Sequence, residues 1–359
     1  MKVALFDTIL ERHLPESLKR ALEYLGHEVI YTDLLLHGHD MISKQSDIDF
    51  MWGEIKKIEA HKPDLLIAFR PMNLTVEMLE YLRSKMKTAI WLSDDPVLYK
   101  TCYSQVVNHY DLILHCGYKE VMEFYESKGH PQGFNFPFWT DHKSFPAIYN
   151  PKNAEIDIAF LGNMNGQVRR KRYMEVANLP FSKKVYGLLD SDPLAIHGGF
   201  IREAYIHTER VTQVLSKAKI GLSIPQFFTE YNGLHYDFPE LASLGYFQFP
   251  SRVIQYAASG LPIAAVGDSR VTEVYPNIFV AKTVTELEPF IEKVVSDEKY
   301  AMEVSSNILK TFRESYSALS RAEMLVAIFK DLEKYQSLDV HSRATLFTEF
   351  KVDYDEGTY

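Results

Sequence analysis

Short apolar runs alternate with amphipathic helical patterns along almost the whole chain, and this alternation limits the folds open to it. In the first half, five runs have the length and composition of buried strands: 3–6, 28–31, 65–69, 88–92 and 111–115. Helical patterns over 16–25, 48–61 and 75–86 lie between them. Strands that alternate with helices in this way are typical of βαβ units, whose strands form a parallel sheet.

The alternation breaks once and then resumes. Residues 134–151 are rich in proline and β-forming residues, which is typical of a connection between domains. Five further strand-like runs follow at 156–161, 185–187, 220–224, 261–266 and 278–281, with long helices at 286–296 and 318–335. We therefore predict an α/β protein with two Rossmann-like, doubly wound domains that face each other across a cleft. The expected domains are 1–150 and 151–335, and residues 336–359 are a tail that either packs back on the first domain or stays loose.

The composition is that of an ordinary globular protein. With 359 residues, of which 46% are hydrophobic, the chain is long enough for two domains. Its formal net charge of −9 argues against a broad nucleic-acid-binding surface. Two cysteines, Cys102 and Cys116, are too few for a disulfide framework or a zinc site. The sequence shows neither a signal peptide nor an apolar run of the ~18 residues that a membrane helix needs, so we expect a cytoplasmic protein without a membrane span.

Ligands of doubly wound sheets bind beyond the carboxyl ends of the strands, so the residues that follow each strand are the candidates for a site. Gly162 and Asn163 follow the run at 156–161, and a basic cluster at 169–172 begins the next helix. Basic side chains in a first helical turn oppose the helix dipole, which a phosphate-bearing ligand would explain and a solvated basic face would explain equally well. The G-x-G-x-x-G spacing is absent, so we predict no dinucleotide and no other cofactor.

The segment 249–262 is the most informative part of the chain. Ser251 has the residue type of a helix N-cap, and Gly260 that of the residue that ends a helix. Arg252 then lies in the first turn, and Gln255 shares its face at i, i+3 spacing. This face suits a phosphate and a sugar ring together, whereas the alternative is a connecting helix with solvated Arg and Gln side chains.

Two adjacent carboxylates, Asp94 and Asp95, follow the strand predicted at 88–92. Mutual repulsion raises the pKa of one member of such a pair, which suits it to act as a general base. The alternative is a simple turn, since Asp-Asp-Pro is a favourable way to begin a loop. The His-Gly-His-Asp run at 37–40 has metal-ligating residue types, but they are too close together to chelate one ion, so we predict no metal site.

Several motifs, taken in this order and spacing over residues 1–330, resemble the GT-B-fold glycosyltransferases, and most closely the group related to the spore-maturation protein CgeB. The segment 252–262 is similar to the donor-site helix of these enzymes. The other motifs are W-L-S-D-D-P at 91–96, Y-D-L-I at 110–113, F-P-F-W-T-D at 136–141, D-I-A-F-L-G-N at 157–163, V-Y-G at 185–187 and A-K-I-G-L-S-I at 218–224.

The resemblance implies a nucleotide-sugar donor on the second domain and an acceptor that approaches from the first. The residues that it implies for the donor diphosphate are Gly162, Asn163, Arg169, Ser251 and Arg252. Those implied for the nucleoside and sugar are Gly187, Ser223, Ile224, Gln255, Tyr256, Gly267 and Asp268. Gln255 stands where the family usually has a glutamate that contacts the ribose, and the second glutamate of the retaining pattern would fall at Phe247.

We therefore expect a metal-independent glycosyltransferase that moves a sugar from a nucleoside-diphosphate sugar, such as a UDP-sugar, to an acceptor hydroxyl. Arg252 would neutralise the leaving diphosphate, and Asp94 or Asp95 would act as base if the reaction inverts. The acceptor is left open between a glycan, a protein, a small molecule and a modified nucleic acid. Two alternatives are a non-catalytic nucleotide-sugar-binding or partner-binding relative and a nucleotide-sugar epimerase of the same fold.

Overall fold

The computed structural model describes residues 1–7, 12–33, 45–69, 74–162, 167–186, 200–203, 208–225, 238–241, 244 and 249–353. Its internal contacts divide the chain into two compact units. Unit 1 comprises Met1–Pro137 and Ala318–Lys351, and unit 2 comprises Phe138–Ser317 with Val352 and Asp353. Each unit contains one parallel sheet, so the predicted α/β class with two Rossmann-like folds is confirmed.

The sheet of unit 1 has six parallel strands in the order β2-β1-β3-β4-β5-β6. Their bounds are β1 Lys2–Asp7, β2 Glu28–Asp33, β3 Leu65–Phe69, β4 Lys87–Leu92, β5 Leu112–His115 and β6 Gly133–Asn135. All five residues of β3 are buried, as expected for a central strand whose two faces are both covered. The strand β6 overlaps the start of the stretch that the sequence assigned to a connection; it is only three residues long.

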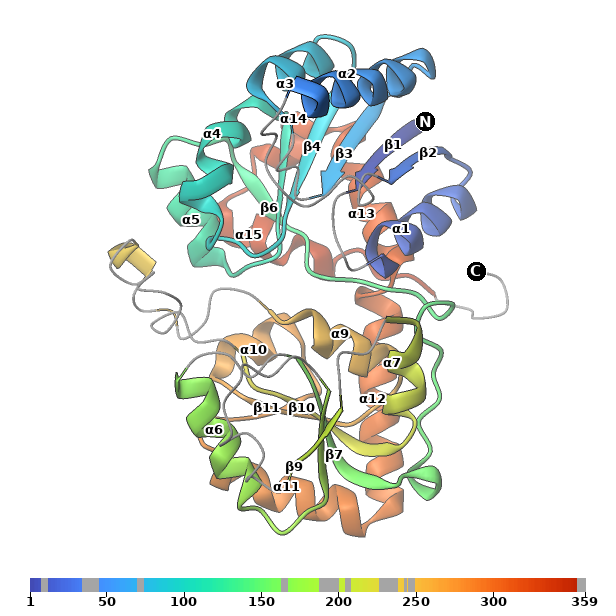
Figure 1. Cartoon of the computed structure of the whole chain (residues 1–359), viewed down its shortest axis with the longest axis vertical. Helices are drawn as coiled ribbons and strands as arrows, with labels where there is room; N and C mark the ends of the chain where they lie inside the picture. The colour runs from blue at the N-terminus through green and yellow to red at the C-terminus, as the bar shows by residue number, and fades with distance from the viewer. Residues whose placement is uncertain are drawn as a thin grey trace. The chain divides into compact units, whose positions relative to one another are not determined.

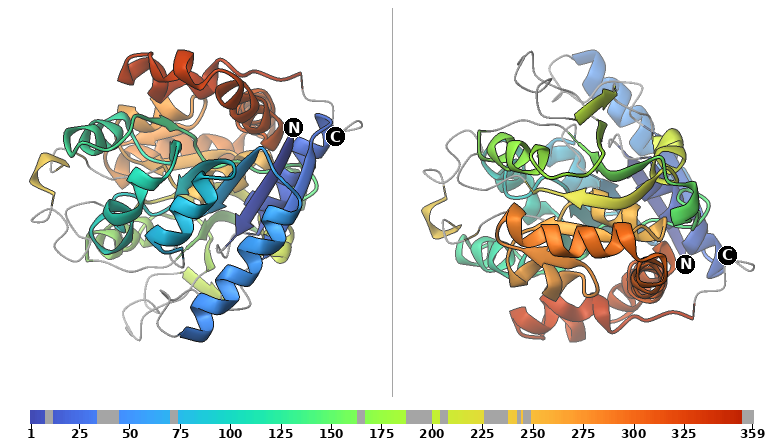
Figure 2. Two further views of the ribbon diagram at one scale, coloured as in Figure 1. Left: turned by 90° about the horizontal axis from the view of Figure 1, so that it is seen from above. Right: turned by 90° about the horizontal axis from the view of Figure 1, so that it is seen from below.

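Helices cover both faces of this sheet. They are α1 His13–Tyr24, α2 Gln45–Ala60, α3 Val76–Arg83, α4 Ser104–Val106, α5 Lys119–Ser127, α13 Ala318–Lys330, α14 Leu332–Gln336 and α15 Val340–Thr345. Seen from above, the red helices α13–α15 and the blue helix α2 lie on opposite sides of the sheet (Figure 2, left). Gly26, with φ +81°, ends α1 in the left-handed conformation that favours glycine.

The C-terminal helices correct the predicted domain boundaries. The sequence placed residues 318–335 in the second domain, whereas α13 packs beside α1 in unit 1 (Figure 1). Arg343 of α15 is buried and donates to the Gly133 carbonyl oxygen at 2.7 Å and to Glu126 at 2.6 Å. The chain also passes from unit 1 to unit 2 earlier than the predicted boundary at residue 150, namely after Pro137. The segment before residue 150 already bonds to unit 2, since the Ile148 and Tyr149 N–H groups donate to the Ser259 carbonyl oxygen.

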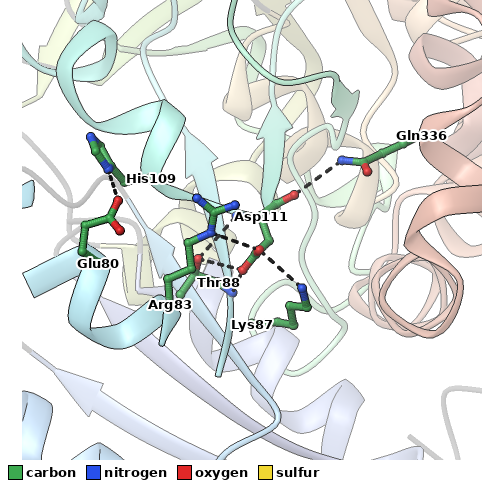
Figure 3. A network of polar contacts seen from close by, with 7 residues as sticks. All are labelled: Glu80, Arg83, Lys87, Thr88, His109, Asp111 and Gln336. Atoms are coloured by element: carbon green, nitrogen blue, oxygen red, sulfur yellow. Dashed lines mark hydrogen bonds and ion pairs between the residues drawn. The ribbon is translucent and has the colours of Figure 1, made fainter. Parts of the chain in front are cut away.

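A polar network joins the amino ends of β4 and β5 (Figure 3). The Asp111 carboxylate accepts from the Thr88 backbone N–H at 2.9 Å and pairs with Arg83 and Lys87. Gln336 of α14 donates to the Asp111 carbonyl oxygen at 3.5 Å. Because ligands of parallel sheets bind at the opposite, carboxyl edge, we assign this network to stability.

The sheet of unit 2 has six parallel strands in the order β12-β11-β10-β7-β8-β9. Their bounds are β7 Ile156–Leu161, β8 Lys183–Tyr186, β9 Phe200–Glu203, β10 Ala218–Ser223, β11 Ile263–Val266 and β12 Phe279–Ala281. The helices are α6 Gln167–Ala177, α7 Thr208–Leu215, α9 Ser251–Ala258, α10 Ser269–Val274, α11 Val284–Ser296 and α12 Glu298–Ser315. The core is built from alternate residues of β7 and β10, such as Ile158 and Leu222, packed with Leu287 and Ile291 of α11.

Neither β9 nor the 18-residue helix α12 was predicted from the sequence. Within the described ranges, no helix is long and apolar enough to cross a membrane.

Candidate functional site

The strand order of unit 2 reverses direction between β7 and β10. From β7 the chain continues to β8 and β9 on one side, and from β10 it continues to β11 and β12 on the other. The two strands are paired up to Phe160 and Leu222. Such a reversal opens a crevice at the carboxyl ends of the two strands, where doubly wound folds bind their ligands.

Tyr256 anchors α9 to the switch point. Its side chain is fully buried, and its ring packs so closely on Gly221 that a Cβ there would lie 2.6 Å from it. The hydroxyl accepts from the Leu161 N–H at 2.8 Å and donates to the Leu222 carbonyl oxygen at 3.1 Å. Tyr256 therefore joins β7 to β10 where their pairing ends. Its hydroxyl is occupied by the sheet, so Tyr256 positions α9; a direct contact of Tyr256 with a donor stays a prediction.

Arg252, one helical turn before Tyr256, brings a positive charge to the same place. Its guanidinium donates to the Ile224 carbonyl oxygen at 3.1 Å and lies 4.9 Å above the centre of the Phe160 ring. The side chain is partly exposed. Within the part of the chain that the structure describes, no carboxylate pairs with this guanidinium. An arginine without an acidic partner at a sheet's carboxyl edge is suited to bind an anion.

Gly162 gives the guanidinium its space. Its φ is +136°, and a Cβ added to it would lie 2.8 Å from a terminal nitrogen of Arg252. The sequence predicted that the Gly162 backbone would approach a phosphate. The Gly162 N–H instead donates to the Tyr186 carbonyl oxygen at 2.8 Å, as part of the sheet. A Cβ at this position would therefore displace the Arg252 guanidinium, and the Gly162 amide is already used by the sheet.

The structure contradicts the predicted start of α9 and confirms its predicted end. Pro250 is the N-cap and Ser251 the first helical residue, so the prediction of Ser251 as N-cap is wrong. The C-terminal prediction is confirmed: Gly260 has φ +74°, its N–H donates to Ala257, and the Leu261 N–H donates to Tyr256. These two bonds form a Schellman motif.

The exposure pattern of α9 leaves one polar face accessible. Its partly exposed residues are Ser251, Arg252 and Gln255, and the other residues of the helix are buried. Arg252 and Gln255 thus share an accessible face, as their spacing predicts.

The other residues predicted for the donor lie at the ends of β10 and β11. Ser223 is buried at the end of β10, and Ile224 contributes the carbonyl oxygen that Arg252 binds. The Gly267 N–H donates to the Ala281 carbonyl oxygen of β12 at 2.8 Å. The Asp268 carboxylate caps α10 through the Arg270 N–H at 2.9 Å and pairs with the Arg270 side chain at 3.0 Å. Three predicted groups, namely Asn163, the Arg169 side chain and Gly187, lie outside the described residues.

In unit 1 the structure separates the two candidate bases. Asp95 is fully buried, and its carboxylate accepts from the Tyr125 hydroxyl at 2.5 Å and from His115 Nδ1 at 2.9 Å. Asp94 is partly exposed and has φ +53°, in the left-handed region. Sequence reasoning missed His115 and Tyr125, because neither belongs to a motif that carries chemistry. No group of three or more metal-ligating residues occurs among those described.

Comparisons with known proteins identify the fold. No protein-family model and no curated protein matches the chain. Solved structures do match over most of its length. A glycosyltransferase from Rickettsia africae has a TM-score of 0.62 at 11% identity, covering 93% of this chain and 98% of its own. Sucrose-phosphate synthase from Thermosynechococcus elongatus has a TM-score of 0.60 at 13% identity, covering 93% and 99%.

A third similar structure is an α-glucosyltransferase in complex with UDP and a 13-mer DNA containing an HMU base. Its TM-score is 0.59 at 13% identity, and the match covers 92% of this chain and all of that one. Identities this low establish the fold alone. The chain has the fold of the GT-B glycosyltransferases.

Proposed function

We propose that this protein is a glycosyltransferase that moves a sugar from a nucleoside-diphosphate sugar to an acceptor hydroxyl. The observation that carries the proposal is Arg252, a cation without a described acidic partner, held at the switch point of unit 2. In sugar transfer, negative charge develops on the leaving diphosphate, and a fixed guanidinium stabilises that charge. Because an arginine supplies the positive charge, we propose that the reaction needs no metal ion.

Three features of the site support a nucleoside-diphosphate sugar as its ligand. Tyr256 holds α9 against the two strands, so the Arg252 side chain starts from a fixed backbone. The Phe160 ring and the Ile224 carbonyl oxygen orient the guanidinium and leave its other N–H groups to bind a ligand. Gln255 lies on the same accessible face of α9, where its amide can hydrogen-bond a ribose or sugar hydroxyl.

The structures with the same fold guide the choice of donor. One similar protein was solved in complex with UDP, which makes UDP-sugars the first donors to test. On the motifs found in the sequence, we also place the chain near the CgeB-like group.

The test is nucleotide binding by the full chain, measured by calorimetric titration and thermal shift in buffer with EDTA. UDP, GDP and dTDP are compared, because they carry different bases on the same diphosphate. At 100 times Kd, a nucleotide that binds the folded state alone adds about 2.7 kcal/mol of stability. Arg252→Met removes charge-assisted hydrogen bonds of about 1.5–3 kcal/mol, so we expect affinity to fall by roughly 10- to 100-fold.

Lys217→Met is the matched control. Lys217 also lies in unit 2 but precedes β10 at the amino edge, where it pairs with Glu155 at 2.9 Å. Its loss removes the same charge from the unit and leaves the proposed site intact. Failure of all three nucleotides to bind would overturn the proposed function. Binding without any release of sugar from the matching nucleotide sugar would favour the non-catalytic alternative.

A further inference from the structure

The pairing between β7 and β10 stops one residue early at the switch point of unit 2. Its last pair joins Phe160 to Leu222, although both strands continue for one more residue. That next residue on β7, Leu161, goes on pairing with β8, and the next residue on β10, Ser223, goes on pairing with β11. The sheet therefore lacks a single pair at its centre, while the pairs on either side of the gap are kept.

A side-chain hydroxyl occupies this gap. The N–H groups of Ile158 and Gly162 face β8, so that of Leu161 faces β10. In a continuous parallel ladder it would donate directly to the Leu222 carbonyl oxygen. Instead, the Tyr256 hydroxyl accepts from this N–H at 2.8 Å and donates to that carbonyl oxygen at 3.1 Å. Two hydrogen bonds in series span more space than one direct bond of about 2.9 Å, so the hydroxyl keeps the strand ends apart.

The phenol that carries this hydroxyl is fixed by its packing. The Tyr256 side chain is fully buried, and a Cβ added to Gly221 would lie 2.6 Å from two atoms of its ring. The ring thus fills the space above the Gly221 backbone. Because the ring is held in this way, the position of its hydroxyl is fixed, and so is the separation of the two strand ends.

The two groups that hold the Arg252 guanidinium come from the two strands that Tyr256 separates. Phe160, whose ring centre lies 4.9 Å from the guanidinium, precedes Leu161 on β7. Ile224, whose carbonyl oxygen accepts from the guanidinium at 3.1 Å, follows the end of β10. Arg252 and Tyr256 are also neighbours on α9 at i, i+4 spacing. The separation of the strand ends therefore determines where the guanidinium lies.

We propose that Tyr256 is the positioning residue of the nucleotide site: its hydroxyl holds β7 and β10 at the separation that places the Arg252 guanidinium against the diphosphate. This inference rests on the proposed function and adds to it a residue that acts through Arg252. Without the hydroxyl, the Leu161 N–H and the Leu222 carbonyl oxygen can approach each other, and the groups that hold the guanidinium move with them. The guanidinium then loses the orientation that a charge-assisted hydrogen bond to a phosphate requires.

The test measures the nucleotide affinity of the full chain by calorimetric titration. It uses whichever of UDP, GDP and dTDP the wild type binds most tightly. Tyr256→Phe removes only the hydroxyl. We expect its affinity for the nucleotide to fall about tenfold, which is part of the roughly 10- to 100-fold that the whole guanidinium contributes.

Tyr275→Phe is the matched control. Tyr275 is also fully buried in unit 2, and its hydroxyl donates to the Ile308 carbonyl oxygen at 2.8 Å. Each of the two variants leaves a buried backbone carbonyl without its donor, so both should lower the melting temperature. Tyr275→Phe should nevertheless bind the nucleotide as tightly as the wild type, because its hydroxyl holds neither β7 nor β10.

A double-mutant cycle distinguishes positioning from a purely structural role. If Tyr256 acts through Arg252, the loss of its hydroxyl has no guanidinium left to displace once Arg252 is replaced. We therefore expect the double variant Arg252→Met, Tyr256→Phe to bind the nucleotide no more weakly than Arg252→Met alone. A hydroxyl that acts independently of the guanidinium would instead give two losses of affinity that multiply.

Gly221→Ala displaces the same hydroxyl by another route, because the added Cβ pushes on the Tyr256 ring. We expect it to weaken nucleotide binding as well, with no further loss when it is combined with Arg252→Met, and it decides the question if Tyr256→Phe does not fold. Unchanged affinity in folded Tyr256→Phe, or a loss that multiplies with that of Arg252→Met, would overturn the inference and leave the proposed function standing. A wild-type chain that binds none of the three nucleotides would overturn both.

Discussion

Gly162 shows how one residue can determine the position of a charged side chain elsewhere in the sequence. A methyl group at this position would meet a terminal nitrogen of Arg252 at 2.8 Å and would hold φ at +136° against its preference. We expect Gly162→Ala to destabilise the protein by at least 1 kcal/mol and to weaken UDP binding about tenfold, because the guanidinium must move. Chemical denaturation and calorimetric titration would measure the two effects.

Gly260→Ala is the control that separates the loss of stability from the loss of UDP affinity. Gly260 also has positive φ, +74°, but the atoms nearest to an added Cβ belong to Ser305 and Tyr149, and not to Arg252. This variant should lose similar stability and bind UDP as tightly as the wild type. Equal affinity in Gly162→Ala and in the wild type would show that the guanidinium finds the same position without the glycine.

His130 makes the stability of unit 1 depend on pH. Burial, with His115 nearby, lowers the pKa of His130 below the usual 6.5. The folded state thus favours the neutral ring, whose Nε2 accepts from the Tyr99 hydroxyl while Nδ1 donates to Asn108. As the pH falls, the unfolded chain takes up a proton on His130 before the folded chain does. This contribution to stability is therefore complete above pH 6.5 and is lost as the pH falls from 6.5 through the folded-state pKa of His130. Urea denaturation between pH 7.5 and 5 should show the decline, and His130→Gln should reduce it. An identical slope in the variant would show that another group is responsible.

At the scale of elements, a buried arginine helps to attach α15 to the sheet of unit 1. The Arg343 side chain is 1% exposed and donates to the carbonyl oxygens of Gly133 and Leu338 and to the Glu126 carboxylate. Arg343→Met leaves these acceptors without their partner, so we expect a loss of about 3 kcal/mol in the free energy of unfolding. Arg83→Met, which removes a 43% exposed arginine paired with Asp111, should cost less than about 1 kcal/mol. Equal losses in denaturant unfolding would contradict this assignment.

Sequence reasoning identified the elements in which the apolar residues form a clear local pattern. Strands such as β3 and β7, which are apolar runs between helices, were predicted with the bounds that the structure shows. Two strands were missed: β6 overlaps the proline-rich stretch that was interpreted as a connection, and no strand was predicted at β9. The assignment of α13 to the wrong unit has another cause. Its packing on α1 joins residues about 300 positions apart, and no local pattern reveals such a contact.

The candidate site was predictable only where a local signal existed. Arg252 was found because a cation in a first helical turn calls for an anion. The hydrogen bonds of Tyr256 and Gly162 to the sheet could not be predicted, because their backbone partners lie on strands distant in the sequence. Asp94 and Asp95 could not be told apart from sequence, since burial of one depends on His115 and Tyr125, 20 and 30 residues further along.

At the scale of the whole molecule, the two units have separate sheets and separate cores, and the chain passes between them more than once. A chain of this kind need not unfold in a single step. Arg343 belongs to unit 1 and the proposed nucleotide site to unit 2, so a mutation at one and a ligand at the other perturb different units. Scanning calorimetry of the full chain can therefore show whether each unit is a cooperative body of its own.

We expect two transitions in such a scan. Arg343→Met should lower one of them by several degrees, because a loss of about 3 kcal/mol is large for a domain of this size. UDP at 100 times its Kd should raise the other by an amount equivalent to about 2.7 kcal/mol, since a ligand stabilises only the unit that binds it. With both perturbations together, the separation between the two transition temperatures should change by the sum of the two shifts. A single transition that responds to both would mean that the units unfold together, and the stability of either would then depend on the ligand of the other.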